Sequence, residues 1–436
     1  MTPLDFLPYL VEGLSVYFLI GILVLVFYFP FLRLSFNIFD PFFLIMVGGY
    51  FSTVLVLFLK HQDLISEKYF TSFIITELSF LLGVSLFSGK LIAIFEYRSR
   101  VNLIERESLS KIKSILLVST AFYFLTTILD YYLNGVPVLR ISRLGAYVGS
   151  GGFGVFERFN DVSLSLLSIS LLAIILTKRD FVNRSIWRFF SITILILLLI
   201  TFVLSGSKSI ALILGFAWFY LTVFWFSGRY CFRVPSFTLN TKGKFFLFLG
   251  FIFSIVTIYI QSSNGGALEM VYHLAFRFVN YGDVFLYAYI NDNIERINGD
   301  NPFIGLFGGF LSIFRVISSN DIYTPIGIQL PRIVQPELDY LTGPNARHNV
   351  AGLHYFGEYF SWIYSLILGL LVSFVRFRLF RYMRSDFFSF CLLFVLTKAL
   401  ITIHVDFEFS MSKLASVIIV YPIVLLLSRS IVKRNG

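Results

Sequence analysis

The sequence predicts an all-α polytopic membrane protein with about eleven transmembrane helices and one large, partly helical outer loop. Of its 436 residues, 57% are hydrophobic and only 14% are charged, whereas soluble proteins carry about 25% charged residues. Apolar runs of about 20 residues recur along the whole chain, which is the length that crosses a bilayer as a helix. The runs lack the two-residue alternation of a β-barrel, and backbone groups in lipid must bond internally, so helices are expected.

Eleven apolar segments are expected to span the membrane, with boundaries accurate to about 2–4 residues. They are residues 14–32, 41–59, 69–88, 113–133, 162–177, 189–205, 210–226, 245–261, 355–375, 387–404 and 414–430. Lys and Arg gather between them at 90–113, 178–188, 229–244, 376–384 and 429–434. Because basic loops stay in the cytoplasm, that side is predicted to be cytoplasmic and the N-terminus outside. We expect one integral membrane domain over 1–436, with 262–354 as a large outer loop between spans.

Composition also limits the other functional classes. The net charge of +10 fits basic cytoplasmic loops, so a nucleic-acid partner is not expected. Cys231 and Cys391 are expected in a loop and in a helix, which disfavours a disulfide or a two-cysteine metal site. The first residues lack Lys, Arg and a small-residue cleavage site, so we expect no signal peptide. We expect no cofactor and no metal site.

The long outer loop is predicted to hold two helical segments. Residues 268–290 mix apolar residues with charged ones, including Arg277 one turn after His273, which is typical of an interfacial helix. Residues 301–317 are apolar, short and rich in glycine, which fits a re-entrant or surface helix.

Cationic residues in the predicted outer loops are the first candidates for a binding site. Positive-inside topology disfavours arginine there, yet Arg140 and Arg143 follow the fourth span with no acid nearby. Arg158 and Arg296 lie beside acids and are expected to be ordinary solvated residues. Arginine donates paired hydrogen bonds to phosphate, so an outer cluster favours a lipid-linked pyrophosphate. The predicted pyrophosphate- or substrate-binding residues are Arg140, Arg143, Lys208, Arg277, Arg332 and Arg347.

The segment Gly343–Glu358, GPNARHNVAGLHYFGE, places an arginine, two histidines and a glutamate at the entrance to the ninth span. If residues 347–358 form one helix, Arg347, His354 and Glu358 fall within about 40° of one another, and His348 points about 100° away. The pattern favours a general base, so His354, Glu358 and His348 are the catalytic candidates, with sugar binding as their alternative role. An ordinary interfacial helix start is the other interpretation. A metal site is disfavoured because no HExxH motif is present.

Charged residues inside the other spans are weaker candidates. Glu77 and Lys398 lie within apolar runs, where a charged residue indicates a function by default. The alternatives are that they neutralise each other or contact lipid phosphate near the ends of the spans. His404, Asp406 and Glu408 cap the tenth span on its outer side and are candidates for lining the same cavity.

This layout resembles the Wzy-type polymerases of O-antigen and other surface polysaccharides. The resemblance rests on the number of spans, on arginine-bearing outer loops in both halves, and on one large outer loop before the last spans. The turn SGSKS at 205–209 is similar to the Ser/Thr-Gly-Ser/Thr-Arg turn of that family, with Lys208 at the arginine position. The Arg-x10-Gly spacing of some members occurs at Arg140/Gly151, Arg143/Gly154 and Arg332/Gly343.

The resemblance implies a GT-C-like membrane glycosyltransferase of the bacterial inner membrane whose active site faces the periplasm. It implies transfer of a growing glycan from undecaprenyl pyrophosphate to a new lipid-linked repeat unit, so donor glycan, acceptor glycan and membrane lipids are the expected partners. A Wzz-type chain-length regulator is implied by the family alone. Two alternatives are an O-antigen ligase that uses lipid A-core as acceptor, and a Wzx-like flippase, which the long outer loop and the lack of repeat symmetry disfavour.

Overall fold

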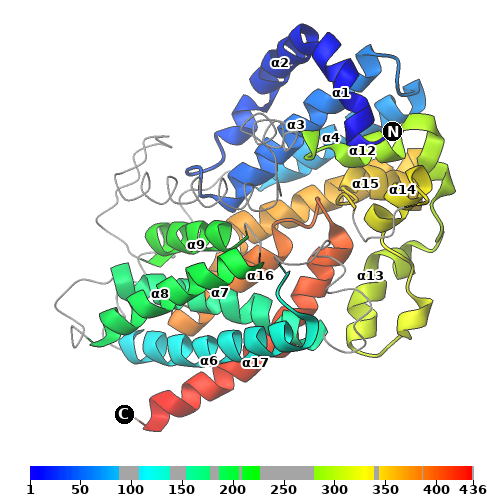
Figure 1. Ribbon diagram of the computed structural model, residues 1–436. Helices are drawn as coiled ribbons and strands as arrows, with labels where there is room; N and C mark the ends of the chain where they lie inside the picture. The colour runs from blue at the N-terminus through cyan, green and yellow to red at the C-terminus, as the bar shows by residue number, and fades with distance from the viewer. Residues whose placement is uncertain are drawn as a thin grey trace, which may run out of the picture. The chain divides into compact units, whose positions relative to one another are not determined.

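The computed structural model describes residues 1–87, 108–137, 154–176, 186–205, 209–225, 279–337, 343–384 and 386–434. These ranges contain helices and turns and no β-strand, which confirms the all-helical class (Figure 1). The elements are α1 (Pro3–Glu12), α2 (Leu14–Leu32), α3 (Pro41–His61), α4 (Glu67–Leu86), α6 (Ser108–Asn134), α7 (Gly154–Leu176), α8 (Ile186–Ser205), α9 (Ser209–Tyr220), η5 (Leu221–Trp225), α12 (Asp283–Ala288), η6 (Ile290–Arg296), α13 (Pro302–Ile313), η7 (Ser319–Asp321), α14 (Ile326–Val334), α15 (His348–Phe377), η8 (Leu379–Tyr382), α16 (Phe387–Leu400) and α17 (Phe407–Arg434).

Eight helices in the described ranges are long and apolar enough to cross a membrane: α2, α3, α4, α6, α7, α8, α15 and α17. They match eight of the predicted spans, so the chain has the character of a polytopic membrane protein. The predicted spans at 210–226 and 387–404 correspond to shorter apolar helices, α9 with η5 and α16. The predicted span at 245–261 lies outside the described residues, and a total of eleven stays a prediction.

The described residues fall into two compact units. The first unit takes its residues from 1–90, 265–378 and 399–412, and the second from 91–264, 379–398 and 413–436. The chain therefore returns to each unit more than once, and the short connection between α16 and α17 belongs to the first unit.

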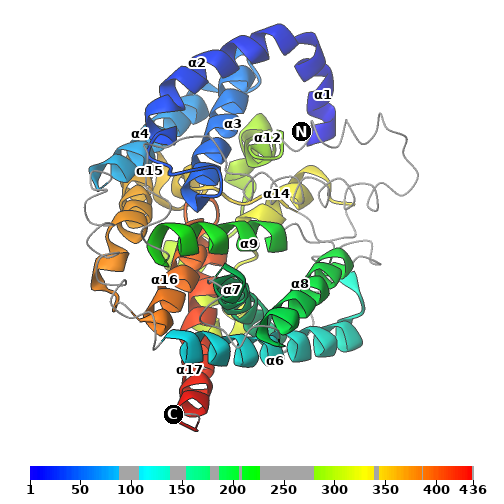
Figure 2. The same ribbon diagram turned by 90° about the vertical axis from the view of Figure 1, so that its left-hand side faces the viewer.

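The first unit is built on the pairing of α4 with α15, which run side by side (Figures 1 and 2). Two glycines bring the helices close: a Cβ on Gly83 would lie 2.5 Å from the carbonyl oxygen of Leu366 and 3.0 Å from the Cα of Gly369. Next to this contact, the Ser373 hydroxyl donates a hydrogen bond of 2.7 Å to the Val84 carbonyl. In lipid, such close packing and interhelical hydrogen bonds are what hold helices together.

The N-terminal helices form one side of the first unit. Thr2 and Asp5 make a capping box that starts α1, and α1 and α2 meet at a corner at Gly13 (Figure 2). A Cβ on Gly13 would lie 2.6 Å from the ring of Phe58 in α3, so a larger residue at this turn would displace that buried ring. Most of α2 is exposed and apolar, as a helix that faces lipid should be, whereas Tyr28 points inward and is fully buried.

A buried ion pair fixes the far end of α15. Arg376 donates to the carboxylate of Asp40, which also caps α3 by accepting a hydrogen bond of 3.0 Å from the Phe42 N–H. The Arg376 guanidinium lies 4.5 Å from the ring centroid of Phe36. Removing one partner of such a pair leaves a buried charge uncompensated, which typically costs about 3–5 kcal/mol.

Helix α15 is broken at Gly357, where φ is 67° and ψ is −176°. The break divides it into helical segments 348–356 and 358–377, and Arg347 precedes the first segment as its N-cap. The prediction that 347–358 form one continuous helix is therefore wrong. The sequence could not reveal the break, because a single glycine is tolerated inside many helices and only the neighbouring contacts decide its conformation.

The outer loop differs from its prediction in one part. The predicted interfacial helix at 268–290 is described only from residue 279, and there the chain turns at Gly282 before the six-residue α12. Val284, Phe285 and Leu286 of α12 are buried in the core of the first unit, so a continuous helix up to 290 is wrong. The short apolar helix predicted within 301–317 is present as α13, and its placement at the membrane stays a prediction.

In the second unit, Lys398 of the apolar helix α16 is paired within the unit. The Lys398 ammonium group lies 2.6 Å from Oδ1 of Asp161 and 2.8 Å from the Ser165 hydroxyl, both on α7. On the adjacent α6, Tyr123 forms a hydrogen bond of 3.0 Å with Thr201 of α8. Mutual neutralisation of Lys398 and Glu77 was one alternative that the sequence left open, and it is wrong because each residue has its partners within its own unit.

We predict that Gly357→Ala destabilises the protein by about 1–3 kcal/mol, since an L side chain is strained at this φ and ψ. A Cβ there would meet no atom within 4 Å, so the loss of stability would come from backbone strain and not from a steric clash. The measurement is thermal unfolding in detergent. The control is Gly309→Ala inside α13, which should cost little or stabilise because a Cβ there would make only ordinary contacts, 3.4 Å from Oε1 of Glu408. Equal melting temperatures for Gly357→Ala and wild type would refute the strain.

Candidate functional site

A cluster of buried polar side chains lies around Glu77, in the middle of α4. Glu77 is 4% exposed, and each of its carboxylate oxygens has a partner. Oε1 accepts a hydrogen bond of 2.6 Å from the Tyr28 hydroxyl, and Oε2 accepts one of 3.2 Å from the Asn349 side-chain amide. The amide also donates to the Thr76 hydroxyl at 3.0 Å. A carboxylate inside an apolar helix is costly unless it is bonded in this way, and such residues commonly serve function.

His348, the first residue of α15, is enclosed by the same cluster. Its Nε2 lies 3.3 Å from Oε2 of Glu77, within ion-pair range but outside ordinary hydrogen-bond geometry. Its Nδ1 lies 3.0 Å from the hydroxyl of Ser365, two turns beyond the helix break. The ring packs on Phe80, with 4.7 Å between ring centroids. Both nitrogens of His348 therefore face a side chain of the protein.

The backbone of Arg347 is strained. Its φ of 44° and ψ of 148° lie in a region that residues with a side chain rarely adopt. Two hydrogen bonds of 2.8 Å hold it there, from the Arg347 N–H to the Val405 carbonyl and from the His348 N–H to the His404 carbonyl. The connection between α16 and α17 thus satisfies N–H groups at the start of α15, which would otherwise lack partners.

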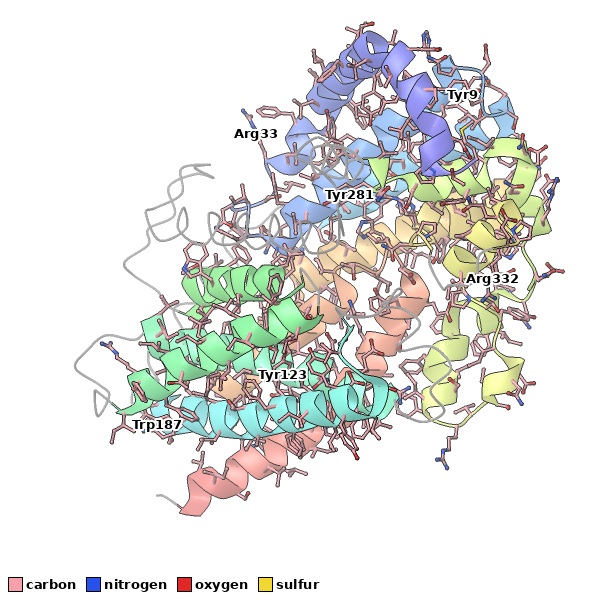
Figure 3. The ribbon with its side chains drawn as sticks, in the orientation of Figure 1. Tyr9, Arg33, Tyr123, Trp187, Tyr281 and Arg332 are labelled. Carbon is pink, nitrogen blue, oxygen red and sulfur yellow. The ribbon has the colours of Figure 1, made fainter. Side chains whose placement is uncertain are left out.

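The side chain of Arg347 is buried but only partly bonded. It is 4% exposed, and its Nη1 donates to the carbonyl oxygens of Tyr281 at 3.2 Å and Gly48 at 3.4 Å (Tyr281 is labelled in Figure 3). Its Nε and Nη2 have no hydrogen-bond partner among the described residues. Because buried polar groups are usually bonded, these two donors are open to a further hydrogen-bond acceptor.

His404 lies beside Arg347 and His348. It is 1% exposed, and its ring centroid is 4.7 Å from that of Phe80 and 6.1 Å from that of His348. Within the described ranges, neither ring nitrogen makes a hydrogen bond of ordinary geometry, although the carbonyl of Ile401 interacts with the ring. Burial and the neighbouring positive charge of Arg347 hold the pKa of His404 well below its usual value, so the ring is neutral.

Asp283, at the start of α12, also approaches Arg347. Burial raises the pKa of Asp283 to about 7, against the opposing effects of a hydrogen bond from the Val284 N–H and the charge of Arg347. The Asp283 carboxyl therefore loses its proton near neutral pH, beside the positive charge of Arg347.

The other predicted site residues lie in different surroundings or outside the described residues. Nε2 of His354 is 3.1 Å from the Gly299 carbonyl oxygen, and Glu358 is exposed, with Oε1 3.2 Å from the Lys68 ammonium group. The predicted stripe of Arg347, His354 and Glu358 is therefore wrong, because Arg347 precedes the helix and Glu358 follows the break at Gly357. Arg332 is exposed on α14 (labelled in Figure 3). Arg140, Arg143, Lys208 and Arg277 lie outside the described residues.

The structure thus brings together Arg347 and His348 from the predicted set and adds Glu77, Asn349 and His404. A charged residue inside an apolar run signalled Glu77, and a histidine at the end of a span signalled His404. Their convergence with His348 was not visible, since these residues are far apart in the sequence. Among the described residues, no group of three or more His, Cys, Asp and Glu is arranged to hold a metal ion.

No family model matches the chain, and no match is found among curated proteins or among solved structures. The chemistry of the cluster is therefore the guide to function. The unpartnered donors of Arg347 suit an anion, and the neutral ring of His404 suits proton acceptance.

We predict that Asp283→Asn stabilises the protein by about 1–3 kcal/mol at pH 8. The folded state holds the Asp283 proton up to about pH 7, whereas the unfolded chain releases it near pH 3.8, so wild-type stability falls as pH rises between these values. Asparagine cannot ionise, and the difference should vanish below about pH 4. Unfolding in detergent from pH 4 to 8 measures this, with exposed Asp321→Asn as control. A pH-independent difference would contradict the assignment.

Proposed function

We propose that this chain is a GT-C-like membrane glycosyltransferase that polymerises undecaprenyl-pyrophosphate-linked oligosaccharide repeat units into a surface polysaccharide of the O-antigen or capsule type. The observation that carries the proposal is the buried, partly bonded guanidinium of Arg347 beside two histidines and Glu77. The Wzy-like layout of the sequence gives the proposal its substrate class. The site is proposed to face the periplasm of the bacterial inner membrane, where both lipid-linked substrates are available.

The chemistry of glycan polymerisation fits these residues. Pyrophosphate leaves from the anomeric carbon of the donor, and negative charge develops on its bridging oxygen. A planar guanidinium with two open donors stabilises such an oxyanion, and it does so strongly where water is excluded. The acceptor hydroxyl attacks the anomeric carbon and loses a proton to a base within hydrogen-bond reach. No nucleotide sugar is needed for this reaction.

The partners of Glu77 support a positioning role for the cluster. His348 and Asn349 follow Arg347 directly, and both contact the Glu77 carboxylate. Together with the carbonyls of His404 and Val405, they hold the start of α15 from two sides. A preorganised arginine does not need to reorganise when charge develops, which is the main source of electrostatic catalysis.

A flippase for the same lipid-linked oligosaccharide is the second candidate. The observation that favours it is the depth of Glu77, since ionisable residues inside membrane helices also form proton relays in transporters. A ligase that uses lipid A-core as acceptor shares the donor and the proposed site. These candidates differ in product and are separated by one assay.

We predict that purified protein in liposomes elongates a lipid-linked repeat unit without a partner protein. Arg347→Ala should lower the elongation rate by about 10²–10³-fold, because a transition-state donor is lost. Arg347→Lys should remain impaired, since a lysine keeps the charge but not the paired donors. Gel separation of the glycan products measures chain length.

The matched control is Arg296→Ala, which removes an exposed arginine and should retain full elongation. Size-exclusion profiles and melting curves establish that the Arg347 variants are folded. Transfer to lipid A-core without elongation would favour the ligase. Translocation of a fluorescent lipid-linked unit without any transfer would favour the flippase and overturn the proposed function.

A further inference from the structure

Two histidines lie in the buried cluster, and they differ in their hydrogen bonding. His348 has Ser365 at Nδ1 and Glu77 at Nε2, so a substrate reaches neither nitrogen without displacing a side chain. His404 has no hydrogen bond of ordinary geometry at either nitrogen within the part of the chain that the structure describes. The Ile401 carbonyl interacts with the buried His404 ring, so one nitrogen can donate there while the lone pair of the other has no partner among the described residues. In His348, by contrast, both nitrogens face a side chain of the protein.

The surroundings of His404 also suit a proton acceptor. Arg347 and His348 on the α15 side and Glu77 of α4 are the charged or titratable groups that act on it, and burial keeps the ring neutral. When Arg347 binds an anion, the positive charge that disfavours protonation of His404 is compensated. The bound pyrophosphate would thus raise the basicity of His404 only when the donor is in place.

We propose that His404 is the catalytic base of the transfer reaction, and that His348 is a positioning residue for Arg347; this inference rests on the proposed glycosyltransferase function. A ring nitrogen of His404 accepts the proton of the acceptor hydroxyl. The acceptor oxygen forms the new bond to the anomeric carbon, while the bond from that carbon to the pyrophosphate oxygen breaks. The bonding electrons leave with the pyrophosphate, whose charge Arg347 stabilises.

The connection between α16 and α17 gives this assignment a structural basis. The carbonyls of His404 and Val405 receive the N–H groups of His348 and Arg347. Base and anion-binding residue are therefore linked through the main chain, and a shift of one moves the other. Such linkage restrains the backbone segments that carry the two side chains, which favours the defined geometry that transfer between two bound substrates requires.

The test separates proton acceptance from ring packing with His404→Phe, which keeps an aromatic ring against Phe80 but has no lone pair. We expect His404→Phe to fold and bind donor normally, with kcat for elongation lowered about 10²–10⁴-fold and KM little changed. His404→Ala should lose as much, and added imidazole should restore activity in a concentration-dependent way. The exposed His61→Phe is the control and should behave as wild type.

The pH profile supplies a second readout. Wild-type kcat should fall at low pH because the base becomes protonated. The residual kcat of His404→Phe should not show this decrease. His348→Asn should weaken binding of the lipid-pyrophosphate donor substrate, whereas its kcat should still fall at low pH. Wild-type activity in His404→Phe, or no imidazole rescue of a folded His404→Ala, would overturn the assignment of the base. If wild type itself fails to elongate, the proposed function fails instead, so the two outcomes are distinguishable.

Discussion

The buried carboxylate of Glu77 has to be hydrogen-bonded, and this requirement organises the polar interior of the first unit. Tyr28 of α2 satisfies one oxygen, and Asn349 at the start of α15 satisfies the other. One residue of α4 therefore fixes the positions of two further helices. Because an unpaired carboxylate in an apolar interior costs several kcal/mol, these helices cannot separate without a large loss of free energy. The start of α15, where Arg347 lies, takes its position from this constraint.

The strain at Arg347 and the break at Gly357 belong to the same arrangement. Backbone conformations that side chains disfavour persist only when surrounding contacts impose them, and they gather at functional sites. Arg347 is held by two main-chain hydrogen bonds and by the contacts of the residues that follow it. The break at Gly357 separates this short helical segment from the long apolar one. The segment can thus be positioned by polar contacts while the rest of α15 packs against α4.

Each unit holds a charged residue within an apolar helix and pairs it internally. The first unit surrounds Glu77 with donors, and the second surrounds the Lys398 ammonium group with the acceptors of Asp161 and Ser165. Lys398 is thereby satisfied by its neighbours, whereas Arg347 keeps two donors without a partner among the described residues. The proposed chemistry is assigned to the first unit because these open donors lie in the cluster of Glu77, His348 and His404. An ion pair whose hydrogen bonds are all made within the protein stabilises helix packing. A cation that keeps unpartnered donors can bind a ligand.

The sequence by itself determined the helical class and the positions of eight apolar spans, because length and apolar composition decide which segments cross a bilayer. It also marked Arg347, His348, Glu77 and His404 as polar residues in costly places. Only the tertiary structure decided which of them meet. Their convergence depends on helix packing between residues far apart in the chain, which periodicity does not encode. The same holds for Gly357: its conformation removed Glu358 from the predicted stripe, and only contacts on both sides of the break could set it.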